Sequence, residues 1–156
     1  MRKIAGMSVA VIVLLGLVGA GSIASAAPEA TPDITTAKTL HFDVVFSPFF
    51  YLDLGDKGPS LGDVLAFHDL LFSNGQRVGE DGGSCVLVQP TRSLVNCTLS
   101  FRVPGGQITV QGLNTSAATK HFAVTGGTGI YQNVRGQGTV VEFGNGKGSA
   151  TFHLLP

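Results

Sequence analysis

The chain has 156 residues, and its ten Lys and Arg balance ten Asp and Glu, so the formal net charge at pH 7 is zero. No basic run and no interleaving of basic with aromatic residues is present, so we expect no nucleic-acid partner. The length suits one domain with one hydrophobic core.

The N-terminal residues have the three parts of a signal peptide. Arg2 and Lys3 form a charged region, residues 9–18 form an apolar one, and Ala24-Ser25-Ala26 is a small-x-small cleavage site. We predict a signal peptide over residues 1–26, cleaved after Ala26, and a secreted, extracellular protein. An uncut membrane anchor is the alternative, but the apolar run is shorter than the roughly 20 residues that span a bilayer. We expect no membrane span after cleavage.

Residues 27–38 (APEATPDITTAK) are rich in Pro, Thr and Ala, and their few apolar residues follow no regular period. This composition predicts a flexible tether between the cleavage site and the fold. We place the folded domain at residues 39–156.

Within this domain, hydrophobic and polar residues alternate with a period of two, and glycine-rich turn signals separate the alternating runs. Residues 62–71 (GDVLAFHDLL) also suit a short helix, but their alternation favours a strand. About eight short strands with tight turns are typical of an all-β sandwich or an up-and-down barrel. The strands that we expect span residues 39–48, 62–73, 76–78, 85–89, 95–103, 107–112, 120–125, 133–143 and 148–155.

Cys85 and Cys97 flank a turn-prone segment, residues 90–93 (PTRS). A hairpin folded about Thr91 sets the two cysteines opposite each other on one face. Opposed Cβ atoms lie about 4.5–5.5 Å apart, while a disulfide needs about 3.5–4.5 Å, so the bond requires a small local adjustment. Because the exported chain leaves the reducing cytosol, we predict a disulfide. The alternatives are a catalytic thiol or a metal pair, which the lack of a nearby His makes unfavourable.

Several blocks of the sequence resemble the plant allene oxide cyclases, which have a Ser-Leu-Gly-Asp strand, an Arg-Val-Gly turn and a Gly-x-Cys-Val-Leu strand. The matching blocks here are residues 60–73 (SLGDVLAFHDLLFS), 77–79 (RVG), 83–88 (GSCVLV), 108–112, 122–131 and 136–138. Dirigent proteins share the Gly-Gly-Thr-Gly block of residues 126–129, the Arg135-Gly136 pair and a final strand like residues 148–155.

The resemblance implies an eight-stranded antiparallel β-barrel, often trimeric, with an apolar cavity at one mouth. Allene oxide cyclases close a fatty-acid-derived epoxide into a cyclopentenone, and dirigent proteins hold radicals for stereoselective coupling. Both work mainly by holding a flexible substrate in a reactive conformation. We therefore expect a cyclase or isomerase that confines an apolar, lipid- or polyketide-derived molecule, uses no cofactor, and forms a possible homo-oligomer, either a trimer or a dimer.

The resemblance also directs attention to particular residues. The first-strand Glu of allene oxide cyclases is absent from residues 40–46, and their second-strand Asn corresponds to Asp69, or to His68 if the register shifts. Cys85 matches a cavity cysteine of that family. Asp43 resembles the acidic residue on the first strand of dirigent proteins.

An inward carboxylate among apolar side chains would have a perturbed pKa and would act as the acid or base. Asp69 is the first catalytic candidate, because it shares a strand face with Leu65, Phe67 and Leu71. Asp43 is the second, and secondary candidates are His68, Arg135 and Tyr51. Burial would raise the pKa of Asp69 unless Tyr51 or Arg135 donates a hydrogen bond to it. For substrate binding we expect a cavity lined by Phe42, Phe67, Val86, Phe101 and Val110, with Tyr51 also in contact.

Other chemistries find no support in the residue spacing. His41, His121 and His153 have no spacing that makes a metal site, and no nucleophile elbow is present. Asn96-Cys97-Thr98 and Asn114-Thr115-Ser116 are formal glycosylation acceptors. The rival functions are a non-catalytic small-molecule-binding barrel and an interaction module whose interior is filled. A cavity would exclude the filled module, and a buried carboxylate within it would favour catalysis.

Overall fold

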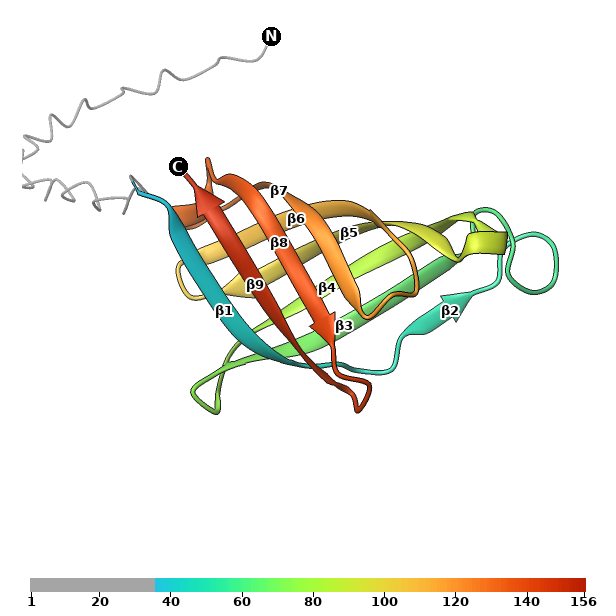
Figure 1. Cartoon of the computed structure of the whole chain (residues 1–156), viewed down its shortest axis with the longest axis horizontal. Coiled ribbons are helices and arrows are strands. Elements are labelled where there is room, and N and C mark those ends of the chain that lie inside the picture. Colours follow the sequence, from blue (N-terminus) through green and yellow to red (C-terminus); the bar gives the residue numbers. More distant parts are fainter. Residues whose placement is uncertain (1–35) are drawn as a thin grey trace, which may run out of the picture.

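Nine β-strands and two short 3-10 helices form the fold of residues 36–156, which are the residues that the computed structural model describes (Figure 1). The predicted signal peptide and residues 27–35 of the predicted tether lie outside the described residues. The elements are β1 (Lys38–Val45), β2 (Phe50–Leu52), β3 (Val64–Ser73), β4 (Gln76–Gln89), η1 (Pro90–Arg92), β5 (Leu94–Val103), β6 (Gly106–Asn114), β7 (Thr119–Gly127), η2 (Gly129–Tyr131), β8 (Arg135–Glu142) and β9 (Lys147–Leu155).

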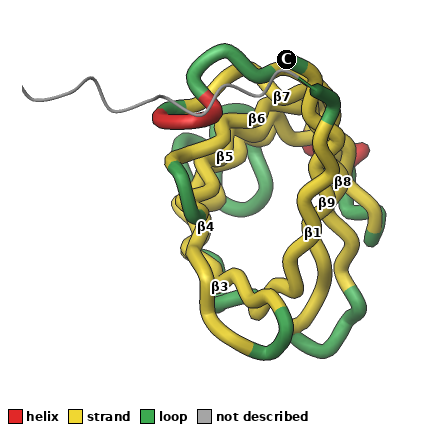
Figure 2. The backbone as a smooth tube through the Cα atoms, turned by 90° about the vertical axis from the view of Figure 1, so that its left-hand side faces the viewer, coloured by secondary structure: helices red, strands yellow, loops and turns green. Residues whose placement is uncertain are grey.

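Eight of these strands close into an antiparallel barrel. Each is hydrogen-bonded to its neighbours in the order β1-β9-β8-β7-β6-β5-β4-β3, and residues 43–45 of β1 pair with residues 70–72 of β3 to close the ring. Figure 2 shows these strands arranged around the barrel interior. The short β2 pairs only with β3 and extends the sheet beyond the ring. The eight-stranded antiparallel β-barrel that we predicted is confirmed.

Hydrophobic side chains fill the end of the barrel that carries the β3–β4 and β5–β6 turns. Leu71, Phe101, Ile108 and Phe152 are fully buried there. The rings of Phe101 and Phe152 meet edge to face with centroids 4.8 Å apart. Burying a side chain of this size stabilises the fold by about 1.5–3 kcal/mol. This packed end anchors the barrel.

Strand β4 differs from the prediction of two separate strands over residues 76–78 and 85–89. The glycines between them form the middle of one continuous strand. A Cβ atom at Gly79 or at Gly83 would collide with a backbone carbonyl of β5. Glycine is needed at these positions because the neighbouring strand approaches closely, and not because the chain turns.

Other element boundaries also differ from the predictions. β1 ends at Val45 and not at residue 48. The Ser47 N–H donates to the Asp69 carboxylate and not to the backbone of a neighbouring strand, and Pro48 has no N–H to donate. β2, with three residues, was not predicted. Residues 64–73 form a strand and not a helix, as the alternation indicated.

The predicted turn at residues 126–129 contains glycines in the left-handed region, since φ is +141° at Gly126 and +61° at Gly129. At Gly129 an added Cβ atom would also collide with the carbonyl of Gly105. Glycine is therefore required in this turn.

The predicted disulfide is present. Cys85 and Cys97 are direct partners in the β4–β5 hairpin, and their sulfur atoms are bonded. Their Cα atoms lie 4.0 Å apart, closer than the about 4.5 Å of an ordinary close pair, which is the local adjustment that the sequence required. Ser93, with φ of +48°, completes the turn after η1.

Candidate functional site

A cavity of about 670 Å³ occupies the barrel end opposite the packed end. On a single strand, the inward residues change from lining the cavity to packing in the core. On β3 the inward residues Leu65, Phe67 and Asp69 line the cavity, and the next one, Leu71, belongs to the core. On β5 the inward residues from Val95 to Leu99 line it, and Phe101 belongs to the core. The barrel is therefore half filled, and Asp69 lies at the floor of the cavity.

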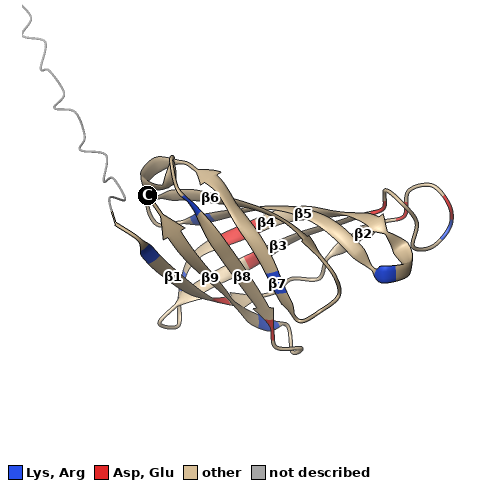
Figure 3. Cartoon of the chain, turned by 45° about the horizontal axis from the view of Figure 1, so that its top comes forward, with Lys and Arg blue, Asp and Glu red and all other residues tan. Residues whose placement is uncertain are grey.

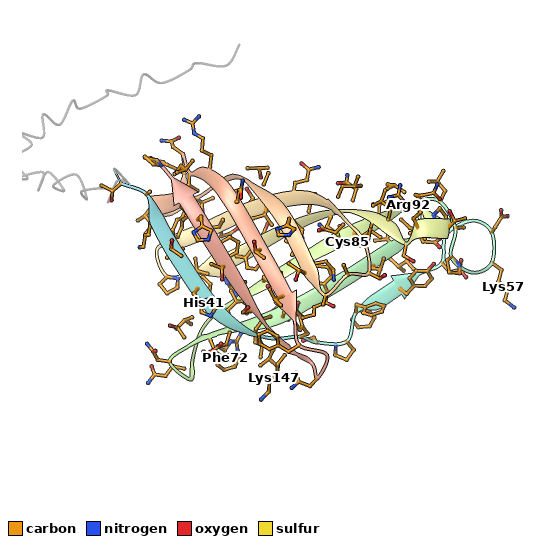
Figure 4. The ribbon with its side chains drawn as sticks, in the orientation of Figure 1. His41, Lys57, Phe72, Cys85, Arg92 and Lys147 are labelled. Carbon is orange, nitrogen blue, oxygen red and sulfur yellow. A yellow bond between two sulfur atoms is a disulfide. The ribbon has the colours of Figure 1, made fainter. Side chains whose placement is uncertain are left out.

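The mouth of the cavity is formed by loops and by β2. Its lining includes Ser47, Phe49, Pro59, Ser93, Thr115, Ser116, Gly144 and Gly146. Figure 1 shows that β2 and the loop after it extend past the end of the barrel, and in Figure 4 Lys57 marks the far part of this loop. We call β2 with residues 53–63 the strap.

The strap is held by the fully buried carboxylate of Asp63. The Tyr51 hydroxyl donates a hydrogen bond to Oδ2, the Leu54 N–H donates to Oδ1 (2.8 Å), and the Ser60 N–H donates to Oδ2 (2.6 Å). These donors, the Tyr51 hydroxyl first, lower the pKa of Asp63 to about 2, while the same contact raises the pKa of Tyr51 to about 12. Asp63 therefore stays ionised and ties the strap to the start of β3.

Asp69 is a buried carboxylate, with 4% of its surface exposed. Burial raises its pKa, and the Ser47 N–H, which donates to Oδ1 at 2.8 Å, partly opposes that shift. Tyr51 hydrogen-bonds Asp63 and not Asp69, and Arg135 is exposed. Neither of these two side chains donates to Asp69, and the raised pKa is the outcome expected in that case.

Asp81 on β4 is the direct strand partner of Asp69, and it is equally buried. Burial first, and then the charge of Asp69, raises its pKa to about 7. Its Oδ1 has no hydrogen-bond partner among the described residues. In Figure 3 acidic segments lie side by side on β3 and β4. Two such carboxyl groups titrate as a coupled pair, and the raised pKa of Asp81 allows this group to hold a proton near neutral pH.

The cavity wall formed by β6, β7 and β8 carries other polar groups. Lys120 forms an ion pair with Glu142 (Nζ to Oε1, 2.9 Å) and donates to the carbonyl of Ala117. Asn114 is buried, and its Oδ1 accepts a hydrogen bond from the His121 N–H at 3.0 Å. The charges on this wall are therefore balanced. Within residues 36–156, no three His, Cys, Asp or Glu side chains are grouped to hold a metal ion.

The structure brings some predicted site residues together and separates others. Asp69, Phe67 and Tyr51 line the cavity, as do the disulfide cysteines. Phe42, Phe101 and Val110 do not, because they lie one layer deeper, in the packed core. The expectation that these three line the cavity is wrong.

Three further candidates lie on the outside of the barrel. Val86 is 38% exposed, because the alternation on β4 turns Cys85 and Leu87 inward, so the expected contact with the substrate is wrong. Asp43 is exposed on the outer face of β1, opposite Phe72 and Ser149. His68 is also exposed, and its ring lies 3.5 Å from Glu80.

Asp81, Asn114, Lys120 and Glu142 were not predicted as site residues. Asp81 could have been found by continuing the period-two pattern upstream from Cys85 through Gly83, which places Asp81 on the inward face. Its glycine neighbours suggested a turn instead. For the other three, no signal in the sequence separates them from surface residues at strand ends.

Comparison with known proteins gives consistent matches. A family model described as allene oxide cyclase barrel like domain matches residues 38–149. A solved structure named pyocyanin demethylase is 30% identical, with a TM-score of 0.69 over 76% of this chain and 100% of that chain. A pterocarpan synthase dirigent protein (19% identity, TM-score 0.58, 77% of this chain and 94% of that chain) shares the fold. So does an exo-specific intermolecular Diels–Alderase (13% identity, TM-score 0.60, 76% of this chain and 98% of that chain).

Proposed function

This chain belongs to the allene oxide cyclase barrel-like family, and we propose that it is an enzyme that confines an apolar small molecule in the barrel cavity and moves a proton on it with Asp69 and Asp81. The cavity volume lies within the range of about 300–1,000 Å³ that is usual for small-molecule sites. Its walls are mostly hydrophobic. A filled interaction module is therefore not supported.

The observation that carries this proposal is the carboxyl pair at the cavity floor. Two buried carboxyl groups in register, one of them without a full set of hydrogen bonds, destabilise a fold relative to apolar residues of similar size. Such an arrangement is typical of a site where proton transfer is needed. A barrel that only bound an apolar molecule would gain nothing from it.

The chemistry that fits best is ring closure or isomerisation. Protonated Asp81 donates its proton to a developing oxygen or carbon anion, and the Asp69 carboxylate removes one proton elsewhere on the molecule, so the formula of the substrate is unchanged. General acid–base catalysis of this kind contributes about 10²–10⁴-fold. Confinement of a flexible lipid- or polyketide-derived substrate supplies the orientation.

Demethylation of an aromatic small molecule is a second candidate. It is favoured by the 30% identity to the pyocyanin demethylase over the whole of that chain. Pyocyanin is therefore a useful probe compound. Loss of a methyl group changes the product mass, and isomerisation does not, so the two candidates are distinguished by mass spectrometry.

We further propose that the protein acts outside the cytosol, where the Cys85–Cys97 disulfide stays oxidised. Intact-mass measurement of protein from the culture medium should give a chain that begins at Ala27. The part of the chain that the structure describes has no helix long and apolar enough to cross a membrane.

The test is untargeted mass spectrometry of a small-molecule extract from the producing organism, incubated with wild-type protein and with variants. We expect a compound that changes retention time or mass with wild type, with Asp81→Asn and Asp69→Asn at least 100-fold slower. Asp43→Asn, on the outer face of β1, is the matched control and should remain active. Equal activity of Asp81→Asn and wild type would refute the proposed chemistry. A compound that is bound but unchanged would leave the non-catalytic barrel as the function.

A further inference from the structure

Asn114 is the second of only two buried side chains in residues 36–156 that have a polar atom without a hydrogen-bond partner. The first is Asp81, which the proposed proton transfer uses. Both side chains line the cavity. The unpaired atom of Asn114 is Nδ2, which is a hydrogen-bond donor, and the residue is only 7% exposed.

The orientation of this amide is fixed by its surroundings. The His121 N–H can only donate, so the Asn114 atom 3.0 Å from it must be the oxygen, and the NH₂ group is the free side. Gly112 also faces inward, and a Cβ atom there would collide with the backbone carbonyl of His121 at 2.5 Å. The same Cβ atom would lie 3.1 Å both from Asn114 Nδ2 and from the Phe122 ring. The NH₂ group thus lies within the cavity wall, beside Gly112 and the Phe122 ring.

The charges nearby indicate what kind of group this donor would meet. The amide is neutral, and the ammonium group of Lys120, on the same wall, is already compensated by Glu142 and by the carbonyl of Ala117. The other ammonium group that lines the cavity belongs to Lys147, an exposed residue at the start of β9. An anionic ligand group on the wall of Asn114 would therefore find Lys120 already paired. A neutral oxygen acceptor satisfies the NH₂ group without a charge imbalance.

We propose that Asn114 donates a hydrogen bond to a neutral carbonyl oxygen of the bound molecule, and that the cavity therefore selects apolar ketones, quinones or lactones over hydrocarbons of the same shape. This inference rests on the proposed function, because it takes the cavity as the ligand site. It adds a specificity-determining contact away from the floor and its two carboxyl groups. Asn114 positions the molecule, and Asp81 and Asp69 act on it.

The test uses two probe compounds with one tricyclic frame. Xanthone has a carbonyl group where xanthene has a methylene. In a fluorescence titration at pH 9, wild-type protein should bind xanthone about tenfold more tightly than xanthene, which corresponds to about 1.4 kcal/mol. The Asn114→Asp variant keeps an oxygen for the His121 N–H but loses the donor once its carboxyl group is ionised, so the preference should disappear. Asn96→Asp, on the exposed face of β5, is the matched control and should keep it.

A second measurement needs no variant. In ¹⁵N-labelled wild-type protein, the side-chain NH₂ signals of Asn114 should shift on addition of xanthone and stay in place with xanthene. Equal affinity for the two compounds, or an unchanged xanthone preference in Asn114→Asp, would overturn the role of Asn114 and leave the cavity as a ligand site. If neither compound binds the wild-type protein, this inference fails together with the ligand-binding cavity on which it rests.

Discussion

At the scale of residues, the two carboxyl groups at the cavity floor act on each other as well as on a ligand. Asp81 lies in a low-dielectric site beside a second acid, so its neutral form is favoured and its pKa rises to about 7. In the unfolded chain the same group titrates near 3.8. The folded protein therefore binds more protons than the unfolded chain between these two values, and it loses stability as the pH rises through this window.

We expect Asp81→Asn to be more stable than wild type above pH 7. The amide carries no charge, so it avoids a penalty of up to about 4 kcal/mol that ionised Asp81 imposes on the fold. Thermal unfolding should show a higher Tm for the variant at pH 8 and nearly equal Tm values at pH 4. A variant that is less stable than wild type at pH 8 would show that the charged form of Asp81 is satisfied in the native protein.

The two acids also differ in how far they could be predicted. Asp69 was predictable, since it shares the period-two face of Leu65 and Phe67 on an uninterrupted run. Asp81 was missed, although the period-two pattern continued upstream from Cys85 places it inward, because the glycines around it have the composition of a turn. The close approach of β5 that requires Gly79 and Gly83 is visible only in the fold. The error for Phe101 has another cause. Alternation shows which side a residue faces, and it does not show how deep in the barrel it lies.

At the scale of elements, the strap is the part of the cavity wall that depends on a single side chain. Three residues spread along the strap, Tyr51, Leu54 and Ser60, donate hydrogen bonds to the carboxylate of Asp63. The barrel strands do not need this contact to pair. The strap was not predictable, because β2 has only three residues and all of them are exposed.

We predict that Asp63→Asn loosens the strap and leaves the barrel intact. The amide NH₂ cannot accept from these donors, so at least one of them loses its partner. Hydrogen exchange should become faster across residues 50–63 and stay unchanged in β5 and β6. The matched control is Asp53→Asn, which alters a contact to the Gly58 N–H on the strap surface (3.0 Å) and should have little effect. Faster exchange throughout the barrel would instead make Asp63 a determinant of the whole fold.

The disulfide links β4 and β5 beside the cavity, and it was predicted from the hairpin spacing together with the expected export from the reducing cytosol. Its two cysteines are 12 residues apart in the sequence, and closing a loop of this size stabilises a fold by about 3 kcal/mol through loop entropy. Urea unfolding of the Cys85→Ser/Cys97→Ser double variant should show a loss of this order. Free thiols in native, non-reduced wild-type protein would contradict the bond itself.

At the scale of the whole molecule, the two ends of the barrel interior differ in packing, and we assign stability to one end and ligand binding to the other. The packed end supplies the buried apolar surface, and the other end keeps an open cavity. The strand pattern and the family blocks were enough to predict the barrel. They could not show where packing ends, because that depends on how side chains from eight strands meet. The expected trimer or dimer stays a prediction.

We predict that this division is visible in a matched pair of variants. Phe101→Ala opens a hole in a filled core and should cost about 3–5 kcal/mol. Phe67→Ala removes a ring that already faces the cavity, so it should cost clearly less and should change xanthone affinity instead. Urea unfolding and ligand titration of both variants measure the two effects. Equal losses of stability would show that the cavity end is packed as tightly as the core.

The most direct test of the acid–base pair is a ¹³C NMR pH titration of the side-chain carboxyl carbons of Asp81 and Asp69 in the native protein. We predict that the two groups titrate as a coupled pair, with one apparent pKa near 7, and that a ligand in the cavity shifts this value. Two independent titrations near pH 4 that a ligand leaves unchanged would contradict an acid–base pair at the floor of the cavity.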